Sequence, residues 1–134
     1  MSAPEVQDPT GRLTATVQTT VLPGDPVGWD PLNRRLDKAD PDASANPILA
    51  QFVAVEGGNA GAPVRLCRQC VLINPDASWT AGKPLYPSGS GGALTHSYAS
   101  AGGIRVNAIG FTVSTGLAII DCSGNLLTPP TAEL

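Results

Sequence analysis

Apolar and β-branched residues occur in short runs along this chain, and Gly, Pro, Asn or Ser separates one run from the next. In residues 12–22, Leu13, Ala15 and Val17 alternate with polar residues, which is the period of two expected of a strand with one buried face. Residues 48–55 are more continuously apolar, which indicates a strand buried on both faces over part of its length. No stretch has the period of an amphipathic helix of three turns, so the pattern predicts an all-β chain. Further strands are expected at residues 27–29, 64–73, 83–86, 105–114, 117–121 and 126–127, and around Leu36.

The same order of turns and strands occurs twice in the chain. Pro26 aligns with Pro84, each two residues after a turn Gly, and Phe52 aligns with Phe111, each five residues before another Gly. This alignment suggests an internal repeat with a period near 59 residues. The alternative is that two β-meanders share turn chemistry by chance. The candidate copies are residues 24–73 and 82–121.

The composition indicates one small domain with a thin core. The chain has 134 residues, of which 15 are Gly and 13 are Pro, and only 4% are aromatic, so much of it is expected in turns and loops. We therefore expect a small β-barrel or sandwich of short strands with long loops, over residues 12–128. Residues 1–11 are expected to form an extended N-terminal arm, and residues 129–134 a Pro-rich extended tail. A thin core favours further burial by oligomerisation or docking.

Charge and terminal sequence narrow the class of partner. A formal net charge of −3 argues against direct nucleic-acid binding, which needs clustered cations. No apolar run approaches the roughly 20 residues needed to span a bilayer, and the first residues lack the features of a signal peptide. The product is therefore expected to be made in a cytoplasm. Three cysteines do not fit a disulfide framework, and no cofactor is expected.

Two features are candidates for catalytic or metal sites. Cys67 and Cys70 form a CxxC, but no second pair or nearby His completes a ligand set, and on a strand these positions point to opposite faces. Cys122 is distant in sequence. His96 is the only His and has no nucleophile signature beside it. The favoured interpretation is two small, half-buried cysteines and a loop His.

Two further patterns resemble ion or phosphate sites only in part. Asp37, Asp40 and Asp42 lack the central Gly and the closing Glu of a Ca²⁺ loop, so a solvated loop is favoured. Residues 88–92 form a Gly-Ser run, but no helix follows to aim amides at a phosphate, so a hairpin loop is favoured.

The two tryptophans are candidates for binding. Trp29 and Trp79 both stand where a predicted strand meets a loop, and Trp is the residue most enriched at binding hot spots. The alternative is that each closes the open end of a barrel.

Together these segments resemble the small β-rich capsid decoration (head cement) proteins of tailed phages. The resemblance covers about residues 24–121 and excludes the loop at 34–46. Phe111 stands where that family has a small residue after Ile-Gly. The segments that carry it are residues 24–27 (GDPV), 80–86 (TAGKPLY), 91–95 (GGALT), 107–114 (NAIGFTVS) and 118–121 (AIID).

The resemblance implies a non-enzymatic β-barrel-like protein, commonly trimeric, on the outer capsid surface at three-fold or quasi-three-fold positions. Its implied partner is the major capsid protein, whose neighbouring subunits it clamps against the pressure of packaged DNA. The implied location is the virion, with no membrane and no direct nucleic-acid contact. The candidate interface residues are Trp29, Trp79, Arg34, Arg35 and Leu13, together with Val6, which follows Glu5 in the N-terminal arm.

Three alternatives remain open at this point. One is a tail- or fibre-associated β-domain of a virion, and another is a carbohydrate-binding module that uses its tryptophans to stack on sugars. The third, from a different class, is a small hydrolase or metal-dependent enzyme that uses the cysteines or His96.

Overall fold

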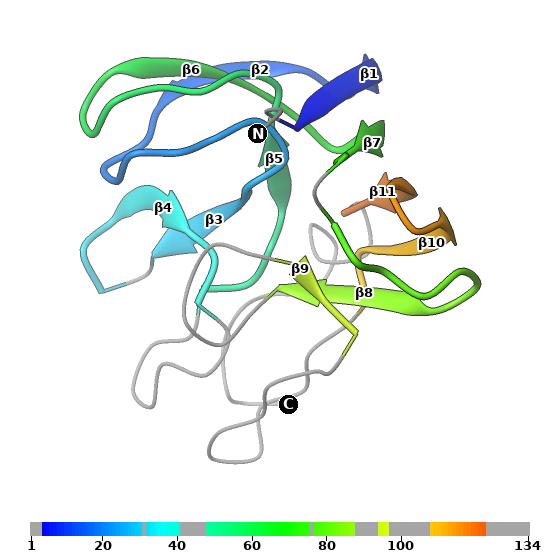
Figure 1. The fold of residues 1–134 in the computed structure, drawn as a ribbon. Coiled ribbons are helices and arrows are strands. Elements are labelled where there is room, and N and C mark those ends of the chain that lie inside the picture. Colours follow the sequence, from blue (N-terminus) through cyan, green and yellow to red (C-terminus); the bar gives the residue numbers. More distant parts are fainter. Residues whose placement is uncertain are drawn as a thin grey trace.

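A computed structural model of the chain describes residues 4–30, 32–40, 48–75, 77–87, 94–96 and 108–122 (Figure 1). All regular structure in these ranges is β, in two antiparallel sheets, so the all-β prediction is confirmed. The sheets do not close into a barrel, and the fold is sandwich-like. The six-stranded sheet has the order β1(Glu5–Thr10), β7(Gln69–Ile73), β11(Leu117–Asp121), β10(Gly110–Ser114), β8(Pro84–Pro87), β9(Leu94–Thr95). The five-stranded sheet has the order β2(Leu13–Thr16), β6(Pro63–Cys67), β5(Phe52–Ala54), β3(Pro26–Asp30), β4(Arg35–Lys38).

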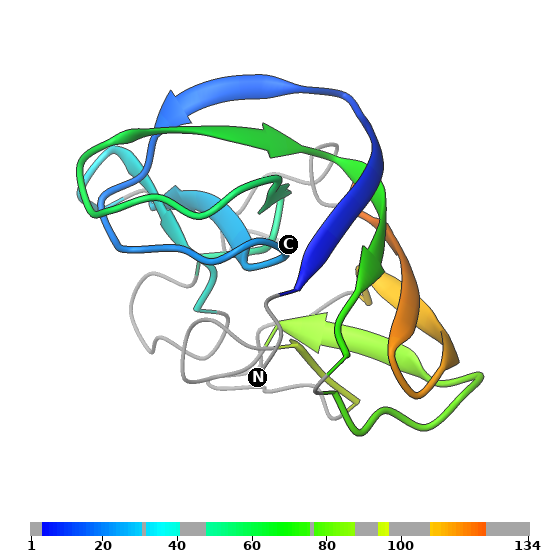
Figure 2. The same cartoon turned by 45° about the horizontal axis from the view of Figure 1, so that its top comes forward.

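Two bent strands join the sheets at one corner. The segment expected to be a single strand at 64–73 is interrupted at Arg68, so that β6 lies in one sheet and β7 in the other. The β1–β2 segment runs beside it over the same corner (Figure 2). Arg68 N donates to Thr10 O at 3.0 Å, and Arg68 O accepts from Cys122 N at 2.8 Å. Gly11 supplies the left-handed backbone of the bend, with φ of 67°, and an added Cβ there would lie 2.6 Å from the Arg68 side chain.

The beginning of the chain differs from the expected arm. Residues 5–10 are extended, but as β1 they pair with β7, and Val6 stands opposite Leu72 and packs against the core. The domain therefore begins at β1 rather than at residue 12. The expected C-terminal tail and the strand at 126–127 lie outside the described residues.

Other predicted strands are shorter in the structure. Within residues 48–55 only Phe52–Ala54 is a strand, and Ile48 makes an isolated bridge to Asp40. Of residues 105–114, the structure describes 108–114, in which β10 begins at Gly110. The short strand expected around Leu36 is confirmed as β4.

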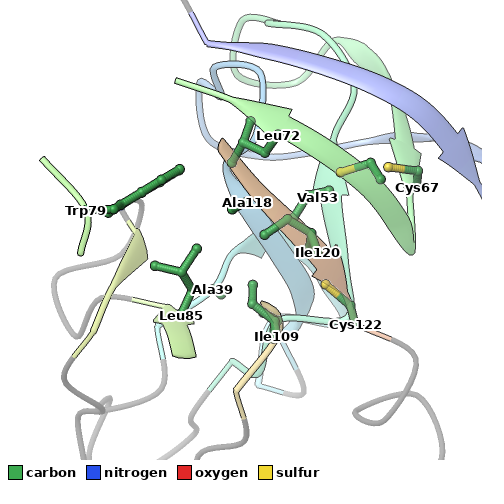
Figure 3. Packing of buried hydrophobic residues seen from close by; sticks show 12 residues of the cluster. Ala39, Val53, Cys67, Leu72, Trp79, Leu85, Ile109, Ala118, Ile120 and Cys122 are labelled. Carbon is green, nitrogen blue, oxygen red and sulfur yellow. The ribbon is translucent and has the colours of Figure 1, made fainter. Parts of the chain in front are cut away.

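Two apolar clusters stabilise the fold. The first lies between the sheets, where Leu72, Trp79, Leu85 and Ile120 converge with residues of the five-stranded sheet such as Val53 (Figure 3). The second lies on the concave side of the five-stranded sheet. This sheet curves so strongly that Val17, just after β2, forms an isolated β-bridge with Leu36 of β4. The members of this second cluster are Val17, Val21, Val27, Ala54, Val64 and Leu66.

The two candidate repeats adopt the same strand arrangement. Strands β6-β5-β3-β4 in one sheet correspond to β11-β10-β8-β9 in the other. Gly24 and Gly82 both have positive φ, of 87° and 78°. Three backbone hydrogen bonds of the first repeat recur 58 residues later in the second. The bond from Gly24 N to Ala54 O (2.8 Å) corresponds to that from Gly82 N to Thr112 O (2.7 Å), and the bond from Ala54 N to Asp25 O (3.0 Å) corresponds to that from Thr112 N to Lys83 O (2.9 Å). The bond from Gln51 N to Val27 O corresponds to that from Ile109 N to Leu85 O, and both are 2.9 Å long.

The spacing corrects the sequence alignment by one residue. Pro26 pairs with Val53 and Pro84 pairs with Phe111, so Val53 and Phe111 are the equivalent residues. Phe52, which the alignment matched to Phe111, is instead equivalent to Gly110. Phe52 and Phe111 share a residue type, but strand pairing places them on opposite faces of their sheets, so residue type alone does not define the equivalent positions.

Candidate interaction surfaces

The outer face of the six-stranded sheet is apolar at its centre, and no other strand among the described residues covers it. Side chains alternate along β10 and β11, so Thr112 and Ala118 enter the core while Phe111 and Ile119 point outward. Phe111 is 50% exposed and Ile119 41% exposed. We call this surface the Phe111 face; its members are Val71, Ile73, Pro84, Phe111, Val113, Leu117 and Ile119.

Charged residues stand only at the margins of the Phe111 face among the described residues. Glu5 lies on the edge strand β1 opposite Ile73, and Asp121 ends β11 opposite Gln69. No other described strand passes over the face (Figures 1 and 2). A contiguous apolar surface with a polar margin is typical of a protein interaction site.

A second candidate surface is the tip of the β3–β4 hairpin, which we call the hairpin tip and define as Trp29, Leu32, Arg34 and Arg35. All four residues are exposed, Leu32 at 68% and Trp29 at 41%. Trp29 N donates to Gln51 Oε1 at 2.9 Å, which fixes the backbone that presents the indole. Trp29, Arg34 and Arg35 thus lie on one hairpin, together with Leu32, an apolar residue in a polar turn that the sequence did not single out.

Asp30 organises the turn at this tip. Its carboxylate accepts from Leu32 N (3.0 Å), Asn33 N (3.2 Å) and Asn33 Nδ2 (2.8 Å), and its carbonyl accepts from Arg34 N (2.8 Å). Burial alone would raise the pKa of the Asp30 carboxyl, but the hydrogen bonds from Asn33 and Leu32, helped by the charge of Arg35, hold the pKa below its ordinary value. The turn thus depends on an ionised carboxylate.

We expect the Asp30 contribution to stability to be present at neutral pH and lost in acid. Because the folded pKa is lowered, this contribution is complete above the ordinary value of 3.8 and disappears as the pH falls through the lower folded value. At pH 7, Asp30→Ala should cost about 1–3 kcal/mol of unfolding free energy. Urea unfolding at pH 7 and pH 2.5 measures this, with Asp30→Asn as a non-titrating control. An equal cost of Asp30→Ala at both pH values would contradict the assignment.

The remaining candidate interface residues lie elsewhere. Trp79 is only 9% exposed and packs in the core between the sheets, so its proposed interface role is wrong for the described conformation. Val6 is half-buried against that core. Leu13 is 43% exposed in β2, opposite Leu66. These three residues therefore do not join the hairpin tip in one surface.

Cys67 and Cys70 do not point to opposite faces as expected. The strand is interrupted at Arg68, so the alternation of inward and outward side chains does not continue from β6 into β7. Both cysteines therefore enter the core between the sheets. The hydrogen bond that the Cys70 thiol donates lowers the pKa of Cys67, whereas this bond and burial raise the pKa of Cys70. Burial also raises the pKa of Cys122, which is 1% exposed. Within the described ranges the three cysteines are free, and no cluster of potential metal ligands occurs.

His96 ties two turns of the second repeat together. Its Nε2 accepts from Thr80 N at 3.0 Å, so Nδ1 carries the proton and donates to Pro84 O at 2.8 Å. Thr112 Oγ1 donates to Thr80 O and accepts from Lys83 N in the same region. Both ring nitrogens of His96 are thus used in holding backbone. His96 also lines an open cavity of about 470 Å³, together with Asp25, Leu72 and Trp79 among others.

The acidic loop is partly described. Asp37 pairs with Arg35 at 3.3 Å and accepts from Thr19 Oγ1, so its carboxylate belongs to the β4 hairpin. Asp40 lies at the bridge to Ile48. Asp42 and the Gly-Ser run at 88–92 lie outside the described residues.

No helix in the described ranges is long and apolar enough to cross a membrane. No family model, curated protein or solved structure matches the chain.

Proposed function

We propose that this chain is a structural virion protein that decorates the outer surface of a tailed-phage capsid and clamps neighbouring major capsid subunits. The proposal is supported by the sequence resemblance and by the presence of exposed surfaces suited to protein contact. Its partners are the major capsid protein and further copies of the chain, and its location is the virion surface.

The observation that carries the proposal is the hairpin tip. Trp29, Leu32 and Arg34 combine an aromatic, an aliphatic and a cationic side chain on one short hairpin. Trp and Arg dominate binding energy at protein interfaces, where they fill pockets and pair with carboxylates. The chain as a whole carries a net charge of −3, and Arg34 places a positive charge at the tip, which suits docking on an acidic patch of a shell.

Co-sedimentation with expanded capsids that lack the chain tests this proposal. The full chain should pellet with the shells, and Trp29→Ala should weaken that binding at least tenfold, as expected of a hot-spot residue. Leu22→Ala is the matched control, because Leu22 is 58% exposed outside the tip. Wild-type protein that stays in the supernatant at micromolar shell concentration would contradict capsid decoration. Wild-type binding with undiminished Trp29→Ala binding would exclude the tip.

A second candidate function is favoured by the exposure of Trp29 alone, which is 41%. An exposed indole on a β-sandwich suits stacking on a sugar ring. Glycan-array binding that is lost in Trp29→Ala, without binding to shells, would favour a carbohydrate-binding module.

A further inference from the structure

The CxxC motif lies at the corner where the chain passes from one sheet to the other. Cys67 is the last residue of β6 in the five-stranded sheet, and Cys70 is the second residue of β7 in the six-stranded sheet. A straight strand would place residues three apart on opposite faces. Because the strand is interrupted at Arg68, both cysteines are instead buried in the same cluster between the sheets. The corner thus brings two thiols to one side of the chain.

These two thiols are the pair best placed for a disulfide. The Cys70 thiol donates a hydrogen bond to the Cys67 sulfur, so the two sulfur atoms already face each other. Cys122 is less well placed, because Cys70 pairs with Ile120 and Cys122 is therefore diagonal to it. Diagonal residues on paired strands stand about 7–8 Å apart, and Cα atoms more than about 7 Å apart cannot be bridged without backbone movement. The sulfurs of Cys67 and Cys122 are also clearly separated in Figure 3.

The surroundings of the pair favour Cys67 as the attacking group. Its pKa is lowered because the Cys70 thiol donates a hydrogen bond to its sulfur, which stabilises the thiolate. The positive charge of Arg12 acts in the same direction. The pKa of Cys70 is raised by the shared hydrogen bond and by burial, so Cys70 keeps its proton while Cys67 reacts.

We propose that Cys67 and Cys70 are a redox-active pair, which closes to a disulfide across the corner when the protein meets a small-molecule disulfide. The Cys67 thiolate attacks one sulfur of the oxidant and forms a mixed disulfide, and one thiolate of the oxidant leaves. The Cys70 thiol then loses its proton and attacks the Cys67 sulfur, which releases the second thiolate. Two protein thiols are oxidised and one oxidant disulfide is reduced. The two protons of the protein thiols end on the two released thiolates.

The new bond would join the two sheets covalently at the corner they share. In a reducing cytoplasm the pair stays as two thiols, and in oxidising surroundings it closes. Both cysteines are buried, so the exchange proceeds when the corner opens locally. The outer side of this corner has an open cavity of about 140 Å³, lined by Thr10, Gly11, Arg68 and Gln69. The redox pair goes beyond capsid decoration and does not depend on it, since the isolated chain suffices to test it.

Redox equilibration of the full chain with reduced and oxidised glutathione tests the pair. The equilibrium is approached from both the reduced and the oxidised chain, once in native buffer and once in concentrated urea. The fold holds the two sulfurs side by side, so the equilibrium constant for closing the disulfide should be at least about tenfold larger in the folded chain. An equal constant, or a larger one in urea, would overturn the proposal.

Tryptic mapping of the oxidised chain identifies which cysteines are joined. Trypsin cleaves after Arg65, Arg68 and Arg105 but not between Lys83 and Pro84, so each cysteine falls in its own peptide. These peptides are residues 66–68, 69–105 and 106–134. The proposal predicts that 66–68 is linked to 69–105 and that the linkage disappears on reduction. A main product linked through 106–134 would contradict it.

Three alanine variants complete the test. Cys122→Ala is the matched control, because it removes a thiol from the same buried cluster and should close its disulfide as the wild type does. Cys67→Ala and Cys70→Ala should form no disulfide within the chain. An internal disulfide that persists in either of these two variants would overturn the assignment. Far-UV circular dichroism of each variant verifies its fold.

Discussion

Replacing Gly28 by alanine is expected to destabilise the protein by at least about 3 kcal/mol. Gly28 lies in β3, and a Cβ at this position would stand 1.7 Å from the carbonyl oxygen of Leu49 and 3.3 Å from Ile48 Cγ2. The nearest atom is backbone, so it cannot move aside as a flexible side chain would. Overpacking of a filled interior usually costs about 1–3 kcal/mol, and a backbone overlap this close belongs at or above the upper end.

Urea unfolding of Gly28→Ala at a fixed protein concentration measures this effect. Gly57→Ala is the matched control, because its added carbon would lie 3.3 Å from the nearest atom, Val21 O, and should change stability by less than about 1 kcal/mol. An unchanged midpoint for Gly28→Ala would contradict the close approach of Leu49 to β3.

Leu85→Ala is expected to cost about 2–5 kcal/mol. Leu85 has no exposed surface and points into the cluster between the sheets (Figure 3). Truncation removes buried methyl groups and leaves a cavity that β-strands on both sides cannot readily fill. Its repeat equivalent Val27 is also fully buried, in the other cluster, so Val27→Ala should destabilise as well, by less because fewer atoms are lost.

The same urea experiment compares these variants with Leu32→Ala, in which a 68% exposed leucine is truncated and the effect should stay within about 0.5 kcal/mol. A Leu85→Ala cost no larger than that of Leu32→Ala would show that the two sheets do not share a packed core. Total stabilities of small domains are about 5–15 kcal/mol, so the expected losses are large fractions of the whole.

The sequence predicted the β class because strand-forming runs and turn residues are local signals. It missed β1, whose residues are mostly polar because this edge strand presents only Val6 to the core. It joined β6 to β7 because apolar residues continue through the corner, where only Arg68 marks the change of sheet. Tertiary pairing, rather than local preference, places that bend.

The surfaces were predicted in part. Trp29, Arg34 and Arg35 were identified from residue type and position beside a loop, and they do lie on one hairpin. Trp79 has the same local setting but faces the core, a difference that only packing decides. Phe111 was recognised as a marker of the repeat and not as a surface residue, because its equivalence to Val53 depends on strand register.

Cryo-electron microscopy of the particles or lysate in which this chain is found tests the proposed capsid role most directly. We expect ordered density for the chain on the outer capsid surface, with the β3–β4 hairpin against the major capsid protein. A shell without this density, or density confined to the tail or fibres, would contradict capsid decoration.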